Sequence, residues 1–76
     1  MLNRYYIDLR NEKPEEKVKI IESIDRYSFI TTLDYETTES GGVIAVGLIA
    51  YLDEPQDLNA ILKSLELDDK LSFIQM

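Results

Sequence analysis

Cysteine, histidine and tryptophan are absent from this chain of 76 residues, and glycine and proline are scarce, with three and two residues. Without cysteine the chain has no disulfide framework, no thiolate nucleophile and no cysteine-based zinc or iron–sulfur site. Without histidine it lacks the usual general base, the Ser-His-Asp arrangement and the commonest metal ligand. We therefore expect no independent catalysis, no bound metal and no cofactor.

Long apolar segments are also missing. No run of apolar residues approaches the roughly 20 that are needed to span a bilayer. The first ten residues alternate and carry charges, which is unlike a signal peptide. The sequence therefore predicts a cytoplasmic protein without a membrane partner.

Basic residues are absent from Tyr27 to Leu62, and the whole chain has 8 Lys and Arg against 15 Asp and Glu, a formal net charge of −7. Such a chain repels phosphate backbones, so we expect no direct binding to nucleic acid. The span without basic residues contains six carboxylates, which we interpret either as solvated surface or as a site for a basic protein partner: Asp34, Glu36, Glu39, Asp53, Glu54 and Asp57.

The length leaves room for one hydrophobic core, so residues 1–76 are expected to form a single domain. Hydrophobic residues make up 45% and charged residues 30%, which is too apolar for a disordered chain. A core this small stabilises the fold by only a few kcal/mol, roughly 3–5, so self-association would help.

Two strands and a helix are expected in the first half of the chain. Residues 4–10 alternate between apolar and polar side chains, which is typical of a half-buried strand. Pro14 suits the first position of a helix over residues 14–26, in which apolar residues recur at helical spacing. Residues 27–36 are rich in β-branched and aromatic residues and become charged on one face, which favours an edge strand.

The second half of the chain is expected to repeat the order strand, helix, strand. Residues 37–42 are a polar connection of hairpin length, and residues 43–52 are apolar throughout, which predicts a central strand. A helix with an acidic N-cap follows over residues 55–67, and residues 71–74 give a short last strand.

The resulting order, βαββαβ, resembles the ferredoxin-like α+β fold. With right-handed crossovers it gives a four-stranded antiparallel sheet that has the first and third strands in the middle and both helices on one face. The resemblance is to a fold and to no particular family. This fold hosts enzymes, ligand sensors, RNA binders and inhibitors, so it does not identify an activity.

Alternation along the central strand predicts which side chains leave the core. We expect Ile44, Val46, Leu48 and Leu52 to face the helices, and Ala45, Gly47, Ile49 and Tyr51 to face away. The sheet face opposite the helices is then expected to carry an apolar patch made of Tyr6, Ile30, Ile49, Tyr51 and Ile74. Exposed apolar patches mark interfaces, so the patch predicts a homodimer or, as an alternative, a site for another partner.

Two features of the sequence indicate other functions, a nuclease and an RNA-binding module. Asp8 lies near the end of the first strand, where small ferredoxin-like nucleases can carry an acidic residue, but no second residue supports that resemblance. Tyr6 and Tyr51 occupy strands on which RNA-recognition modules stack bases, but the basic signature of those modules is missing. Neither signal changes the expectation of a binding protein.

The sequence therefore predicts a small acidic interaction module, regulatory or inhibitory, that presents carboxylates to a basic protein partner, for example one that handles nucleic acid. The alternative is a small-ligand sensor or an accessory subunit of a larger enzyme. Complementary charge would speed association and select the partner.

Overall fold

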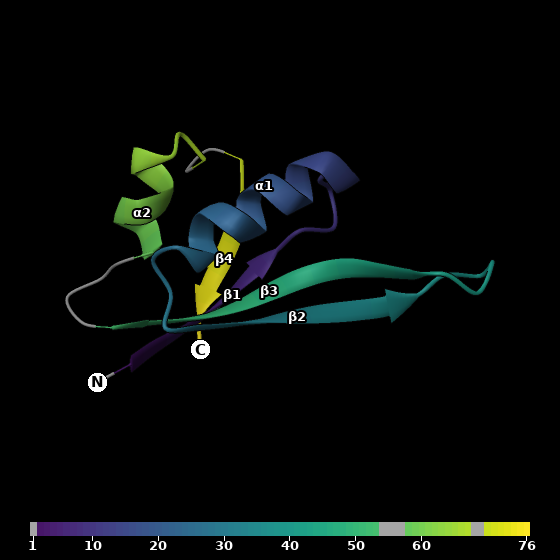
Figure 1. Cartoon of the computed structure of the whole chain (residues 1–76), viewed down its shortest axis with the longest axis horizontal. Coiled ribbons are helices and arrows are strands. Elements are labelled where there is room, and N and C mark those ends of the chain that lie inside the picture. The colour runs from purple at the N-terminus through teal and green to yellow at the C-terminus, as the bar shows by residue number, and fades with distance from the viewer. Residues whose placement is uncertain (1, 54–57, 68–69) are drawn as a thin grey trace.

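A computed structural model of the chain describes residues 2–53, 58–67 and 70–76. In chain order, these residues form β1 (Leu2–Asp8), α1 (Pro14–Asp25), β2 (Ile30–Thr37), β3 (Val43–Asp53), α2 (Leu58–Ser64) and β4 (Ser72–Gln75) (Figure 1). The predicted βαββαβ order is confirmed.

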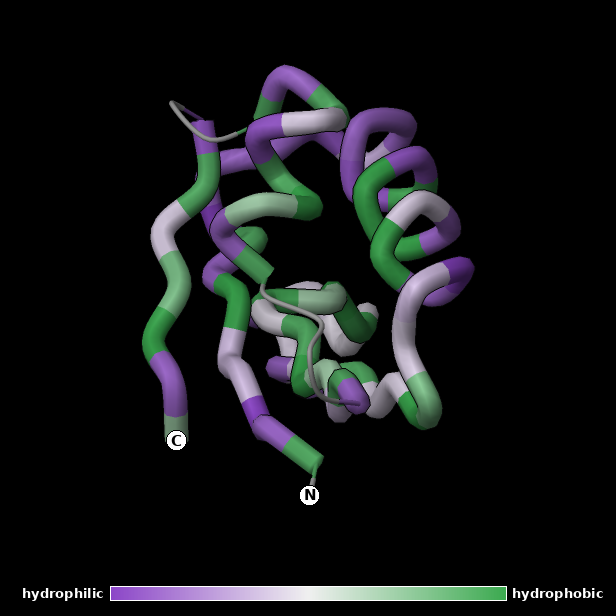
Figure 2. The backbone as a smooth tube through the Cα atoms, turned by 90° about the vertical axis from the view of Figure 1, so that its left-hand side faces the viewer, coloured by the Kyte–Doolittle hydropathy of each residue, from purple (hydrophilic) through white to green (hydrophobic). Residues whose placement is uncertain are grey.

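The four strands form one antiparallel sheet in the order β2-β3-β1-β4, and both helices lie on the same face of it (Figure 1). This is the ferredoxin-like α+β arrangement that the sequence predicts. β1 and β4 run side by side and lead to the two chain ends at one side of the molecule (Figure 2). The other sheet face, called the open face below, carries no helix.

The ends of the elements differ from the prediction where the backbone amides find other acceptors. β2 begins at Ile30 and not at Tyr27, because the amides of Tyr27 and Ser28 donate to the carbonyls of Ile24 and Asp25 and prolong the helical turn. β1 ends at Asp8, whose carboxylate accepts a hydrogen bond of 2.9 Å from the amide of Arg10. Such local side-chain bonds favour turns over strands.

The second helix is shorter than predicted at its end and stops at Ser64. Glu66 has a left-handed backbone with φ of 61°, and the amide of Leu67 donates to the carbonyl of Leu62 at 2.8 Å. This is a Schellman-type helix end, at which glycine is the usual residue. The predicted start of this helix lies outside the described residues.

A bulge in the β2–β3 hairpin corrects the predicted facing of one end of β3. Asp34 pairs with Gly47, but Tyr35 pairs with Ala45 and Glu36 with Ile44, so Val46 is the extra residue. Directly paired residues share a face, and a bulge therefore reverses the alternation beyond it. Ile44 belongs to the open face with Glu36, and Ala45 belongs to the helix face, opposite to the prediction.

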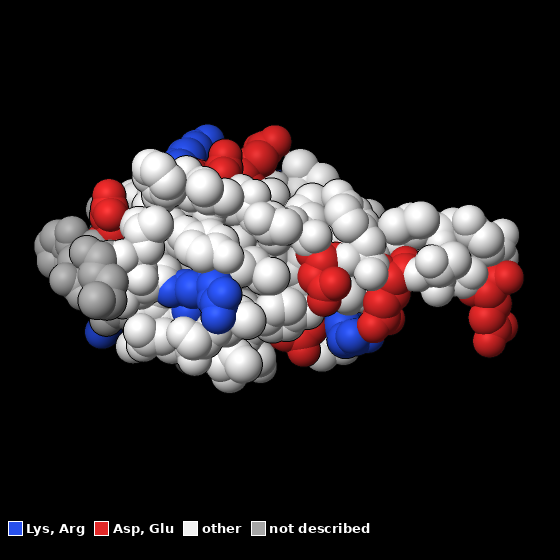
Figure 3. Space-filling view, turned by 90° about the horizontal axis from the view of Figure 1, so that it is seen from below, with Lys and Arg blue, Asp and Glu red and all other residues white. Residues whose placement is uncertain are grey.

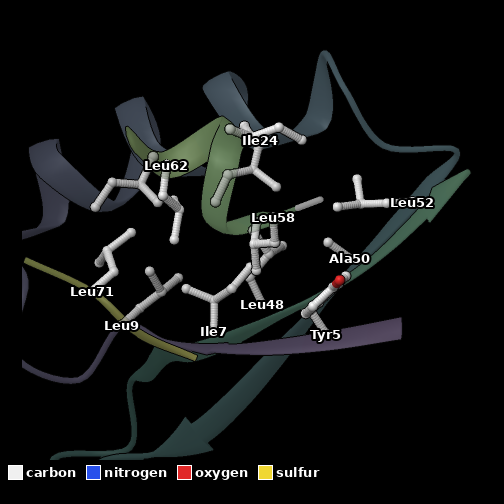
Figure 4. Packing of buried hydrophobic residues seen from close by; sticks show 12 residues of the cluster. Tyr5, Ile7, Leu9, Ile24, Leu48, Ala50, Leu52, Leu58, Leu62 and Leu71 are labelled. Carbon is white, nitrogen blue, oxygen red and sulfur yellow. The ribbon is translucent and has the colours of Figure 1, made fainter. Parts of the chain in front are cut away.

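The core lies between the sheet and the two helices. Its largest fully buried side chains come from four elements and from the residue after β1: Ile7, Leu9, Ile24, Val46, Leu48, Leu52, Leu58 and Leu62. All of these except Val46 are labelled in Figure 4. Tyr5 and Phe73 meet edge to face on the same side of the sheet, with ring centroids 6.0 Å apart. Among the described residues, no polar or charged side chain is buried. Packing is therefore what holds the described part of the chain together.

The β2–β3 hairpin extends beyond the helical layer (Figure 1). β3 has 11 residues and α1 has 12. At about 3.3 Å per strand residue and 1.5 Å per helix residue, the strand is roughly twice as long as the helix. Residues 38–42 close the hairpin, with Gly41 at a φ of 87° that strongly favours glycine. The hairpin therefore ends in an arm without a helix above it.

Candidate functional site

Tyr6 lies across the centre of the open face. Its hydroxyl donates a hydrogen bond of 2.9 Å to Oδ2 of Asp34, two strands away. The ring passes directly over Gly47, where a Cβ atom would lie 2.8 Å from Cε2 of Tyr6 and closer still to the hydroxyl end. Glycine on β3 is thus what allows Tyr6 to reach Asp34.

This arrangement raises the pKa of Tyr6 above its ordinary value. The largest cause is desolvation of the hydroxyl, and the hydrogen bond to Asp34 adds to it because it holds the proton in place. The tyrosine is therefore a neutral hydrogen-bond donor near neutral pH and not a base.

Arg10 and Glu36 form a two-pronged ion pair next to this group. The two guanidinium nitrogens of Arg10 lie 3.0 and 2.5 Å from the two carboxylate oxygens of Glu36. The hydrogen bonds lower the pKa of Glu36 and raise that of Arg10. Glu36 lies in the span without basic residues, and it is thus neutralised by Arg10, which lies outside that span.

The four described members of the six predicted acidic residues do not gather into one cluster. Asp34 and Glu36 lie on the open face of β2, and Glu39 lies in the loop at the tip of the hairpin. Asp53 lies at the far end of β3, opposite Leu2. Glu54 and Asp57 lie outside the described residues. In Figure 3, which looks onto the open face, carboxylates gather along the half of the molecule in which the hairpin projects.

The five predicted residues of the sheet patch do lie together. Tyr6 pairs with Ile49 on one side and with Ile74 on the other, and Ile30 pairs with Tyr51 in the adjacent row. Ile74 is 64% exposed and Ile30 is 49% exposed, while the other three are half-buried. The open face thus has an apolar centre that runs across all four strands.

A second apolar surface was missed by the sequence analysis. Between α1 and the hairpin lies a groove of about 360 Å³, whose apolar lining includes Val18 and Ile21 of the helix and Leu33, Tyr35 and Val43 of the strands. Val18, Tyr35 and Val43 are all more than half exposed. The lengths of the predicted elements could have indicated this groove, because a helix as short as α1 does not cover a hairpin as long as β2–β3.

No group of three or more acidic side chains among the described residues is arranged to hold a metal ion. The hydroxyls of Ser28 and Ser64 donate to carbonyls of the preceding helical turn, as ordinary helix-end contacts do. Within residues 2–53, 58–67 and 70–76, no helix is both long and apolar enough to cross a membrane.

Comparison of the chain with protein-family models, with curated proteins and with solved structures gave no significant match. The class that can be stated is a small ferredoxin-like α+β domain with a projecting hairpin.

Proposed function

We propose that this chain is a protein-interaction module, regulatory or inhibitory, that uses its β2–β3 hairpin to engage a basic surface of another protein. The observation that carries the proposal is the arm itself. It extends past the helices, it carries Glu36 and Glu39, and the whole span from Tyr27 to Leu62 contains no Lys or Arg.

Charge and apolar surface occur together on the arm. Tyr35, Val43 and Ile44 are 56%, 64% and 46% exposed; Ile44 shares the open face with Glu36, while Tyr35 and Val43 lie on the helix face of the same hairpin. Protein interfaces typically have an apolar or aromatic centre inside a polar rim, and tyrosine is among the residues that contribute most to binding. The hairpin supplies both parts from one continuous segment.

The two carboxylates near the tip have different roles in this proposal. Glu39 is exposed and, within the described part of the chain, has no ion-pair partner. Glu36 is held by Arg10, so a basic partner competes with an existing pair in which both side chains are about half exposed. Water screens both charges of an exposed pair, so exchange of Arg10 for a partner's basic group costs little.

A partner with a basic surface is often one that binds nucleic acid, and an acidic arm that occupies such a surface would act as an inhibitor. Attraction between complementary surfaces mainly raises the association rate. We therefore expect binding that slows as the salt concentration rises.

The experiment is an affinity capture from lysate of the source cells with the tagged protein, followed by mass spectrometry and then by kinetics with the purified partner. The test variant carries Glu36→Lys and Glu39→Lys, which leave the Tyr6–Asp34 bond intact. The matched control carries Glu22→Lys and Glu66→Lys, two exposed positions on the other side of the sheet with the same change of charge.

A basic partner that is lost with the hairpin variant and retained by the control supports the proposal. Equal binding by both variants and the unchanged protein would overturn it, and so would equal loss with both, because total charge and not the hairpin would then be responsible.

The small-ligand alternative is favoured by two hollows, one of about 230 Å³ beside Tyr6, Asp8 and Ile74 and one of about 470 Å³ beside Arg4, Tyr51 and Met76. Small-molecule sites usually enclose about 300–1,000 Å³, so the first hollow is small for one and the second, like the groove beside α1, has the volume of one. A metabolite that raises the melting temperature of the unchanged protein, and not that of an Ile74→Lys variant, would favour this alternative.

A further inference from the structure

The open face consists of rows of side chains that cross the sheet. The middle row contains Thr32, Ile49, Tyr6 and Ile74. The row on one side of it contains Ile30, Tyr51 and Arg4, and the row on the other side contains Asp34, Gly47 and Asp8. A middle row that is apolar on β3, β1 and β4 is thus flanked by a row with one cation and a row with two carboxylates.

We propose that this face is covered by a second copy of the same chain, packed sheet to sheet about a two-fold axis that runs along the middle row. The axis brings Ile49 and Tyr6 against their own counterparts. It also places each cationic row over the carboxylate row of the other copy, so that Arg4 faces Asp8 of the second copy. The interface is separate from the hairpin arm and does not depend on the proposed function.

The charges on the face favour this partner. Arg4 is exposed and, among the residues that the structure describes, has no ion-pair partner. Asp8 accepts one hydrogen bond from a backbone amide and has a second oxygen free for a donor. A two-fold axis parallel to the strands would instead place the carboxylate row of one copy over the carboxylate row of the other. Like charges that face each other across an interface oppose association, and this selects the axis along the row.

Tyr6 is suited to burial in such an interface. A buried tyrosine hydroxyl needs a hydrogen-bond partner, and the hydroxyl of Tyr6 already has one in Asp34 within the same chain. Covering the ring therefore removes apolar surface from water and leaves no donor unpaired. The glycine beneath it keeps the ring flat against the sheet.

The area is sufficient for a dimer of modest affinity. Four strands at about 4.8 Å and the seven residues of β1 at about 3.3 Å give a plane of roughly 19 by 23 Å on each copy. When the area is counted on both copies and the uneven surface of the side chains is included, the dimer buries on the order of 1,000 Å² of accessible surface. This is the lower bound for a specific interface. A dimer that dissociates on dilution is the expected behaviour.

The test is sedimentation equilibrium of the full chain, from micromolar to near-millimolar protein, at physiological ionic strength. We expect the average mass to rise with concentration from 8.8 kDa towards twice that value. Arg4→Glu alone and Asp8→Arg alone should each raise the dissociation constant by about tenfold or more, since each places two like-charged pairs in the interface. An equimolar mixture of the two variants should associate again, because every pair is then restored.

Circular dichroism verifies that each variant is folded. If Asp8→Arg fails to fold, Ile74→Lys replaces it, because this side chain is 64% exposed on the edge strand β4 and its replacement should prevent association alone. Lys19→Glu and Glu22→Arg, on the outer side of α1, are the charge-matched controls and should leave the dissociation constant unchanged.

A mass that stays at 8.8 kDa throughout the concentration range overturns the proposal. A dimer that forms but is indifferent to Arg4→Glu, Asp8→Arg and Ile74→Lys also overturns it, because the interface must then lie on another face.

Discussion

Substitution of Gly47 by alanine tests the geometry at the centre of the open face. The added Cβ atom would lie 2.8 Å from Cε2 of Tyr6 and closer to Cζ and the hydroxyl oxygen. The Tyr6 ring must then turn away from the sheet and release Asp34, whose bond to Tyr6 is 2.9 Å long. We expect Gly47→Ala to destabilise the fold, although alanine is ordinarily favoured over glycine in a strand.

The magnitude follows from two opposing effects. Loss of the hydrogen bond and of the contact between the ring and the sheet costs about 1.5–2 kcal/mol, of which the bond contributes about 1 kcal/mol. Replacing glycine reduces the entropy of the unfolded chain and returns roughly 0.5–1 kcal/mol. The net effect is a loss of about 1 kcal/mol, which corresponds to a fall in melting temperature of about 4–8 °C for a domain of this size.

The assay is urea and thermal unfolding followed by circular dichroism, at a protein concentration where the chain is monomeric. The decisive control is the same substitution in a Tyr6→Ala background. With the ring removed, only the entropic effect remains, and Gly47→Ala should stabilise the protein by about 0.5 kcal/mol. If Gly47→Ala destabilises both backgrounds equally, the ring is not the cause and our reasoning about this site is wrong.

Three further predictions concern titration and helix termination. Because the pKa of Tyr6 is raised, its contribution to stability is complete below the ordinary tyrosine pKa of about 10 and is lost as the pH rises through the folded pKa. In a titration followed by tyrosinate absorbance, the tyrosine that ionises last should ionise at lower pH in Asp34→Asn. The lowered pKa of Glu36 has the opposite sign, so its contribution is present at neutral pH and is lost as the pH falls through the folded pKa. Arg10→Met should return that pKa towards its ordinary value in a carboxyl carbon NMR titration, and an unchanged pKa would contradict the ion pair. Glu66→Gly should stabilise the protein by about 1 kcal/mol in urea unfolding, because the left-handed backbone at this position is strained for any residue with a Cβ atom.

Much of the fold could be predicted because the determining signals are local. Pro14 marks the start of α1, the alternation of residues 4–10 predicts β1, and an apolar run marks β3 as central. The element order then leaves few topologies once crossovers are right-handed. The sheet patch was predictable for the same reason, since alternation alone separates Tyr6 and Ile49 from the core.

The errors about side-chain facing and about charge pairing came from contacts between residues that are distant in sequence. Nothing in the local pattern shows the bulge at Val46, which depends on how β2 and β3 pair and which places Ile44 on the face opposite to the one predicted. The neutralisation of Glu36 by Arg10 joins residues 26 positions apart, so the acidic span looked unopposed in the sequence.

The amino-acid sequence by itself determined the order of elements, the acidic character of the chain and most residues of the core, because propensity, periodicity and charge are properties of single residues and their near neighbours. Only the tertiary structure decided that Tyr6 lies over Gly47, that Arg4 and the carboxylates occupy opposite rows of one face, and that the hairpin outreaches its helix. These features depend on register and on relative length, which are set when separate segments pack together.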